Sequence, residues 1–151
     1  MENQNTPSLG DMLRQKITAD DTAKQRAEAE AERQRQEKEA SDRACVQHFY
    51  DNARQTFTEQ IMAGKRPTAI RVESFRQNGR VAELLKLFKK SPANEGNPNP
   101  RSPDHDPYYP FWVEFRDWAA QNGLEAKWVY EYDGGGMSSW YMLTVEPTKI
   151  S

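Results

Sequence analysis

The chain has 151 residues, of which 36% are hydrophobic and 29% are charged, and its formal net charge is -2. A balance so close to neutral provides no long-range attraction to nucleic acid or to an anionic membrane. The mean hydropathy of -1.02 shows that part of the chain is too polar to belong to a hydrophobic core. All Trp, Tyr and Phe lie after Cys45, and residues 18–44 have no apolar side chain larger than Ala. These contrasts predict a polar N-terminal region, residues 1–44, and a compact domain, residues 45–151.

Four apolar side chains occur at helical spacing near the start of the chain. Ser8 precedes them as a candidate helix cap, with Asp11 at the third helical position. The pattern predicts a short amphipathic helix, although the capping residues that recur within residues 18–21 leave open whether it continues beyond them. The four side chains that share one face are Leu9, Met12, Leu13 and Ile17.

Residues 22–44 consist almost entirely of good helix formers, with oppositely charged pairs such as Glu30 and Arg33 one turn apart. No Leu or Ile occupies heptad positions, so a self-sufficient coiled coil is not expected. Two interpretations remain open, a solvated helix and a helix that lies on a large partner surface.

The first helix of the compact domain shows a continuous apolar stripe from Val46 to Ile61, with a stop at Gly64 and Pro67. A short strand is expected over residues 68–75. Asn78 is expected to cap a second helix. The apolar side of that helix consists of Val81, Leu84, Leu85 and Phe88.

Residues 91–107 form a long connection rich in Pro and Asn. An aromatic helix follows from Phe111, with Asp106 or Tyr109 before a proline suited to its first turn. Alternating residues then predict strands over 125–132 and 137–145, joined by the glycine-rich turn 133–136. The fold class is therefore α+β, with a long charged N-terminal helix, three helices in all and a three-stranded antiparallel sheet.

The order of these elements, helix, strand, helix, helix, strand, strand, resembles a winged helix-turn-helix domain over residues 45–147. The resemblance implies a recognition helix at residues 111–122 and a wing tip at 133–136. Two features depart from it: the connection before the third helix is long, and Glu114 and Asp117 accompany Arg116 on that helix. A simple α+β sandwich fits the same order of elements.

No catalytic or metal-binding motif is present. Cys45 and His48 are three residues apart on a predicted helix, and His105 lies between two aspartates, but four Cys or His ligands of a structural zinc are not available. Glycines 134–136 lie between strands and do not open a helix, so a phosphate-binding loop is not expected. We therefore expect no enzyme activity, no cofactor and no metal.

The expected function is a structural or assembly subunit that binds other proteins, or further copies of itself, within a larger complex such as a virion. The expected partner-binding residues are Leu9, Met12, Leu13, Ile17, Tyr108 and Tyr109, the two tyrosines being expected to lie exposed. The alternative is a winged-helix-like regulator that dimerises through its arm and binds nucleic acid through Arg116, Gln121, Asn122 and Lys127.

The expected location is the cytoplasm, or a virion assembled there. A single cysteine excludes an internal disulfide, and the first residues lack the basic and apolar regions of a signal peptide. No apolar run approaches the ~20 residues needed to span a bilayer, so no membrane association is expected.

Overall fold

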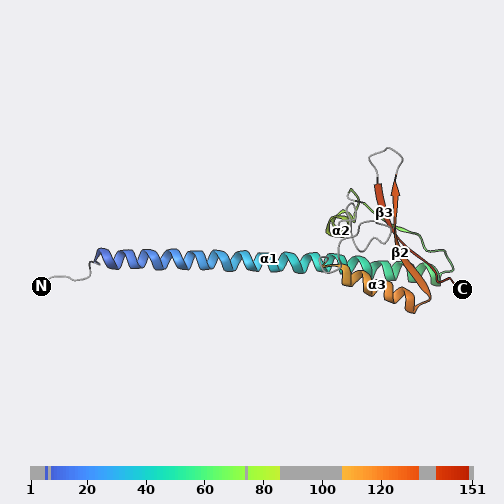
Figure 1. The fold of residues 1–151 in the computed structure, drawn as a ribbon, viewed down its shortest axis with the longest axis horizontal. Coiled ribbons are helices and arrows are strands. Elements are labelled where there is room, and N and C mark those ends of the chain that lie inside the picture. The colour runs from blue at the N-terminus through green and yellow to red at the C-terminus, as the bar shows by residue number, and fades with distance from the viewer. Residues whose placement is uncertain (1–5, 7, 74, 86–106, 133–138, 150–151) are drawn as a thin grey trace. The chain divides into compact units, whose positions relative to one another are not determined.

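The structure is a computed structural model that describes residues 6, 8–73, 75–85, 107–132 and 139–149. Its elements are, in chain order, α1 (Leu9–Met62), β1 (Ile70–Val72), α2 (Gly79–Leu85), α3 (Tyr109–Gln121), β2 (Leu124–Tyr132) and β3 (Ser139–Pro147) (Figure 1). Within the described residues these form three helices and one three-stranded antiparallel sheet. The predicted α+β class and the predicted order of elements are confirmed.

The first helix is continuous from Leu9 to Met62 and does not break at residues 18–21. Ser8 caps it as predicted, because the Ser8 hydroxyl accepts a hydrogen bond from the backbone N–H of Asp11 at 3.1 Å. The capping residues at 18–21 therefore do not interrupt the helix. The strong helix propensity of the surrounding residues explains why it continues through them.

The chain divides into two compact units, residues 1–41 and residues 42–151. The first unit contains the N-terminal part of α1, and the second contains the rest of α1 and every other described element. Asp42 is already buried in the second unit, which explains why the unit begins slightly before the boundary expected at residue 45.

The sheet has the strand order β1-β3-β2, with β3 in the centre. The predicted hairpin is present: β2 and β3 pair along their whole length, from Leu124 opposite Pro147 to Tyr132 opposite Ser139. Its turn lies outside the described residues. The strand predicted over residues 68–75 is too long, because β1 pairs with β3 only through Ile70–Val72.

The core of the second unit lies between one face of the sheet and the three helices. Tyr50 and Phe57 of α1 pack against Phe115 of α3, with ring centroids 5.4 and 6.3 Å apart. Trp128 on β2 lies 6.4 Å from Trp112 on α3. The remaining buried hydrophobic residues are Val46, Ala53, Val72, Val81, Ala82, Leu85, Ala119, Ala126, Tyr141, Leu143 and Val145.

Glycine ends two of the helices. Gly64 after α1 and Gly123 after α3 have φ angles of 77° and 71°, a left-handed conformation that is free of steric cost only for glycine. Pro110 lies in the first turn of α3, preceded by Tyr108 at the N-cap position. The expected positions of these two helix ends therefore agree with the structure to within a residue or two.

Candidate protein-interaction surfaces

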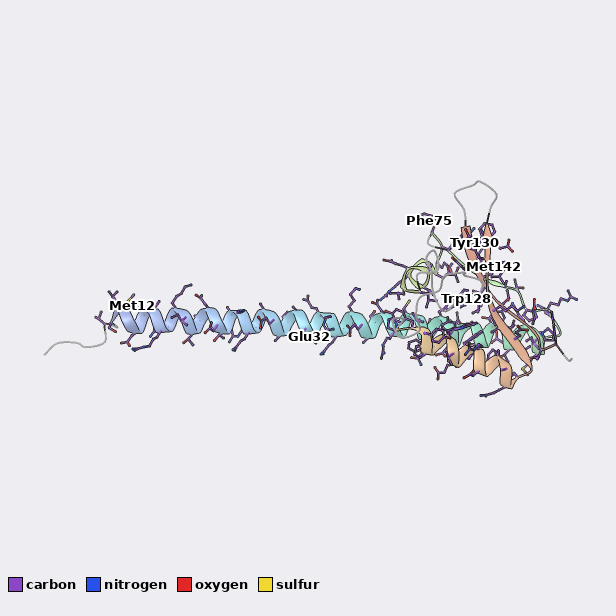
Figure 2. All side chains as sticks on the ribbon, viewed as in Figure 1. Met12, Glu32, Phe75, Trp128, Tyr130 and Met142 are labelled. Atoms are coloured by element: carbon purple, nitrogen blue, oxygen red, sulfur yellow. The ribbon has the colours of Figure 1, made fainter. Side chains whose placement is uncertain are left out.

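The N-terminal apolar face consists of Leu9, Met12, Leu13 and Ile17, and all four side chains are exposed. Their exposed fractions are 84%, 52%, 60% and 51% (Met12 is labelled in Figure 2). Each such side chain stabilises a complex by about 1.5–3 kcal/mol when it is fully removed from water. Because the four share one side of a helix, a groove on a partner could cover them together.

Several of the charged residues that follow this face are paired within the helix itself. Arg33 contacts Glu30 and Glu37, and Arg35 contacts Glu32 and Glu39, at distances that include 2.5 Å for Arg33 to Glu37 and 2.9 Å for Arg35 to Glu39. Arg33 and Arg35 hold the pKa values of Glu30 and Glu32 below their usual range. These charges therefore need no partner, in contrast to the apolar face.

Phe75 is the most exposed large hydrophobic residue that the structure describes, at 95% (Figure 2). The turn that presents it is held by Asn78, whose side chain accepts a hydrogen bond from the Glu73 N–H at 3.3 Å and donates one to the Arg71 carbonyl at 2.5 Å. Arg76 also pairs with Glu73. A fixed turn with an exposed aromatic side chain is typical of an anchor residue at an interface.

Sequence reasoning missed Phe75 because it assigned the residue to a strand. The turn signal Asn78-Gly79 lies only three residues after Phe75 and could have indicated that the strand ends earlier. Asn78 was predicted to cap α2, but its side-chain amide binds back to the residues that leave β1.

The prediction that Tyr108 and Tyr109 are exposed is wrong. Both side chains are half-buried and pack against the hydrophobic core. They lie at the start of α3, where the helix brings its first turn against the core formed by α1 and the sheet. Their burial leaves Phe75 and the N-terminal apolar face as the more accessible apolar anchors among the described residues.

Aromatic residues also lie along the hairpin. Tyr130 is 47% exposed, and its ring centroid lies 5.0 Å from that of Tyr141 on β3 (Figure 2). On the other face of the hairpin, the guanidinium carbon of Arg71 lies 3.6 Å from the centroid of the Trp140 ring, a cation–π contact that partly covers this indole. Most of the aromatic residues that the sequence places on the sheet are thus in the core or in mutual contact.

A groove of about 580 Å³ lies between the end of α1 and the last residues of β3. It forms because β1 pairs with β3 only as far as Leu143, which leaves residues 144–147 without a strand on that side in the described part of the chain. Ile61, the last residue of the predicted apolar stripe, is 40% exposed at this groove. We call it the α1–β3 groove; its apolar lining includes Ile61, Pro67, Ala69, Leu124, Val145 and Pro147.

The residues of the nucleic-acid alternative do not form one basic surface. Arg116 is half-buried on α3, and Gln121 is exposed near the end of that helix. Asn122 donates a hydrogen bond to the Trp118 carbonyl at 2.8 Å. Lys127 on β2 lies between two glutamates, with 3.7 Å to Glu146. This set offers little free positive charge for phosphate contacts.

Cys45 is half-buried and His48 is exposed on α1, whereas His105 lies outside the described residues. Nowhere in the described part of the chain do three or more Cys, His, Asp or Glu side chains come together as a metal site requires. None of the described helices carries an apolar stretch long enough to cross a bilayer.

No protein family model, curated protein or solved structure matches this chain. The candidate surfaces therefore rest on the geometry and chemistry of the chain itself.

Proposed function

We propose that this chain is a non-enzymatic subunit of a larger protein assembly, and that it anchors to a neighbouring protein through its N-terminal apolar face. The observation that carries the proposal is the exposure of Leu9, Met12, Leu13 and Ile17 on one face of a helix. Water penalises such a face, and burial against a partner removes the penalty.

The composition of the rest of the first unit supports this interpretation. Residues 18–41 contain no apolar side chain larger than alanine, and Arg33 and Arg35 pair with four glutamates of the same helix. The apolar face is therefore a local feature with a sharp boundary, as expected for a binding segment at the end of a spacer. Phe75 supplies a second anchor on the other unit, so the subunit has a contact point on each unit.

A nucleic-acid-binding regulator is not proposed, because the exposed face of α3 carries Glu114 and Asp117. A helix that enters the major groove needs a basic or amide-rich exposed face.

The test is cross-linking of the full chain in extracts from its native source, followed by mass spectrometry. Lys16 lies within the N-terminal apolar segment, so it should cross-link to a partner polypeptide. Replacing Leu13 and Ile17 together by alanine should abolish that cross-link, since it removes apolar area and keeps helix propensity. The matched control replaces Gln15 and Thr18, on the opposite face, by alanine and should leave the cross-link intact. Unchanged partner binding in the Leu13 and Ile17 variant would overturn the proposal.

A further inference from the structure

We propose that the N-terminal apolar face of one copy docks in the α1–β3 groove of a second copy, so that the chain associates with itself through two different surfaces. This inference rests on the proposed function and names the partner as another copy of the same chain.

The two surfaces match in shape and polarity. Leu9, Met12, Leu13 and Ile17 form a narrow apolar face at the helical spacing that groove-binding helices use. The groove has about 580 Å³ of free space, and most of the side chains around it are apolar. Met62, next to Ile61 on α1, is 83% exposed and extends the apolar surface beside the groove.

The unpaired charges beside the two surfaces are opposite in sign, since Arg14 and Lys16 of the apolar segment already pair with aspartates of their own helix. Lys65 and Arg66 line the groove and are exposed, and neither has an ion pair in the part of the chain that the structure describes. Glu146, the acidic residue of the groove, is within 3.7 Å of Lys127. Asp20 and Asp21 follow the apolar face by about one helical turn. Asp20 pairs with Lys16 at 3.0 Å, whereas Asp21 has no ion pair among the described residues.

The expected affinity is modest. Only four apolar side chains leave water in this contact, and the translational and rotational freedom lost on association offsets much of their contribution. Self-association should therefore appear between micromolar and millimolar concentrations of the chain. Because the two surfaces differ, contacts either are reciprocal between two copies or pass from copy to copy.

The test is analytical ultracentrifugation of the full chain over this concentration range. The wild type should gain mass with concentration. Leu13→Glu in the apolar face and Ile61→Glu in the groove should each remain monomeric, because both positions are exposed and both place a charge in the contact. The matched controls are Gln15→Glu and Asn52→Glu, exposed positions of α1 that line neither surface, which should associate like the wild type.

Mixing the two variants separates this inference from other modes of association. Leu13→Glu keeps an intact groove and Ile61→Glu keeps an intact apolar face, so the mixture should regain a complex. A cross-link between Lys16 of an isotope-labelled copy and Lys65 of an unlabelled copy should then appear. Association of Ile61→Glu as strong as that of the wild type would overturn the inference, because the apolar faces would then be pairing with each other.

Two further outcomes would overturn the inference. A wild type that remains monomeric while Lys16 cross-links to Lys65 of the same copy would place the apolar face in the chain's own groove. A monomeric wild type whose Lys16 still cross-links to a different protein would refute self-association and leave the proposed function standing.

Discussion

Arg80 of α2 donates a hydrogen bond to the carboxylate of Asp42 on α1, with 2.7 Å between Arg80 Nη2 and Asp42 Oδ1. Asp42 is only 7% exposed, and it begins the second compact unit. The hydrogen bond with Asp42 is the main reason that the pKa of Arg80 is raised. A buried carboxylate is stable only when a partner compensates for its lost hydration, so this contact joins α2 to the first turn of α1 within the unit.

Replacing Arg80 by alanine should lower the thermal unfolding midpoint, since Asp42 would keep its burial and lose this partner. Arg80→Lys should recover part of the loss because it restores the charge without the guanidinium geometry. Arg43→Ala is the control, an exposed arginine next to Asp42. Equal midpoints for the alanine variants at positions 80 and 43 would contradict this account.

Truncation of two phenylalanines should affect the free energy of unfolding to very different extents. Phe115 of α3 is fully buried against Tyr50 and Phe57 of α1, so Phe115→Ala should destabilise the chain by about 3–5 kcal/mol. Phe75 is 95% exposed, so Phe75→Ala should change stability by no more than ~0.5 kcal/mol. Urea unfolding followed by tryptophan fluorescence measures both. A large loss in Phe75→Ala would show that this side chain packs within the fold, and would remove it as an interface anchor.

Acid should weaken the turn that presents Phe75. Arg76, and to a smaller extent Arg71, hold the pKa of Glu73 below its usual range. A carboxyl group whose pKa is lower in the folded state stabilises the fold above its unfolded pKa, and that contribution is lost as the pH falls through the folded pKa.

The stability difference between the wild type and Glu73→Gln should therefore be largest near neutral pH and shrink below the usual glutamate pKa of ~4.3. Unfolding free energies measured over this range test the prediction. Glu83→Gln, which alters an exposed glutamate on α2, is the control. A stability difference that grows on acidification would contradict a lowered pKa of Glu73 in the folded state.

A helix break in the first unit should leave the second unit stable. Ala27→Pro removes a backbone hydrogen bond inside α1 and costs about 3 kcal/mol of local helix stability. The far-ultraviolet helix signal should fall, while the unfolding midpoint measured by tryptophan fluorescence should stay constant, because all four tryptophans lie in residues 42–151. Ala27→Gln preserves the helix as a control. A lowered fluorescence midpoint in the proline variant would show that the two units are thermodynamically coupled.

The sequence by itself determined the elements that depend on local pattern. The helical spacing from Val46 to Phe57 identified the buried side of α1, and the alternation in residues 125–132 identified the hairpin. The exposure of Leu9, Met12, Leu13 and Ile17 was also predictable, because no apolar residue near them in the chain could cover that face.

Only the tertiary structure decided the features that depend on contacts distant in sequence. Strand β1 is shorter than the predicted strand because only residues 70–72 pair with β3. Phe75 is exposed because the turn held by Asn78 begins earlier than the alternation of side chains suggested. Tyr108 and Tyr109 are half-buried because α3 packs against the core. Arg80, which hydrogen-bonds to Asp42, lies 38 residues away in the sequence. Burial and ion pairing follow from which segments meet in space, and a local sequence pattern contains no information about those distances.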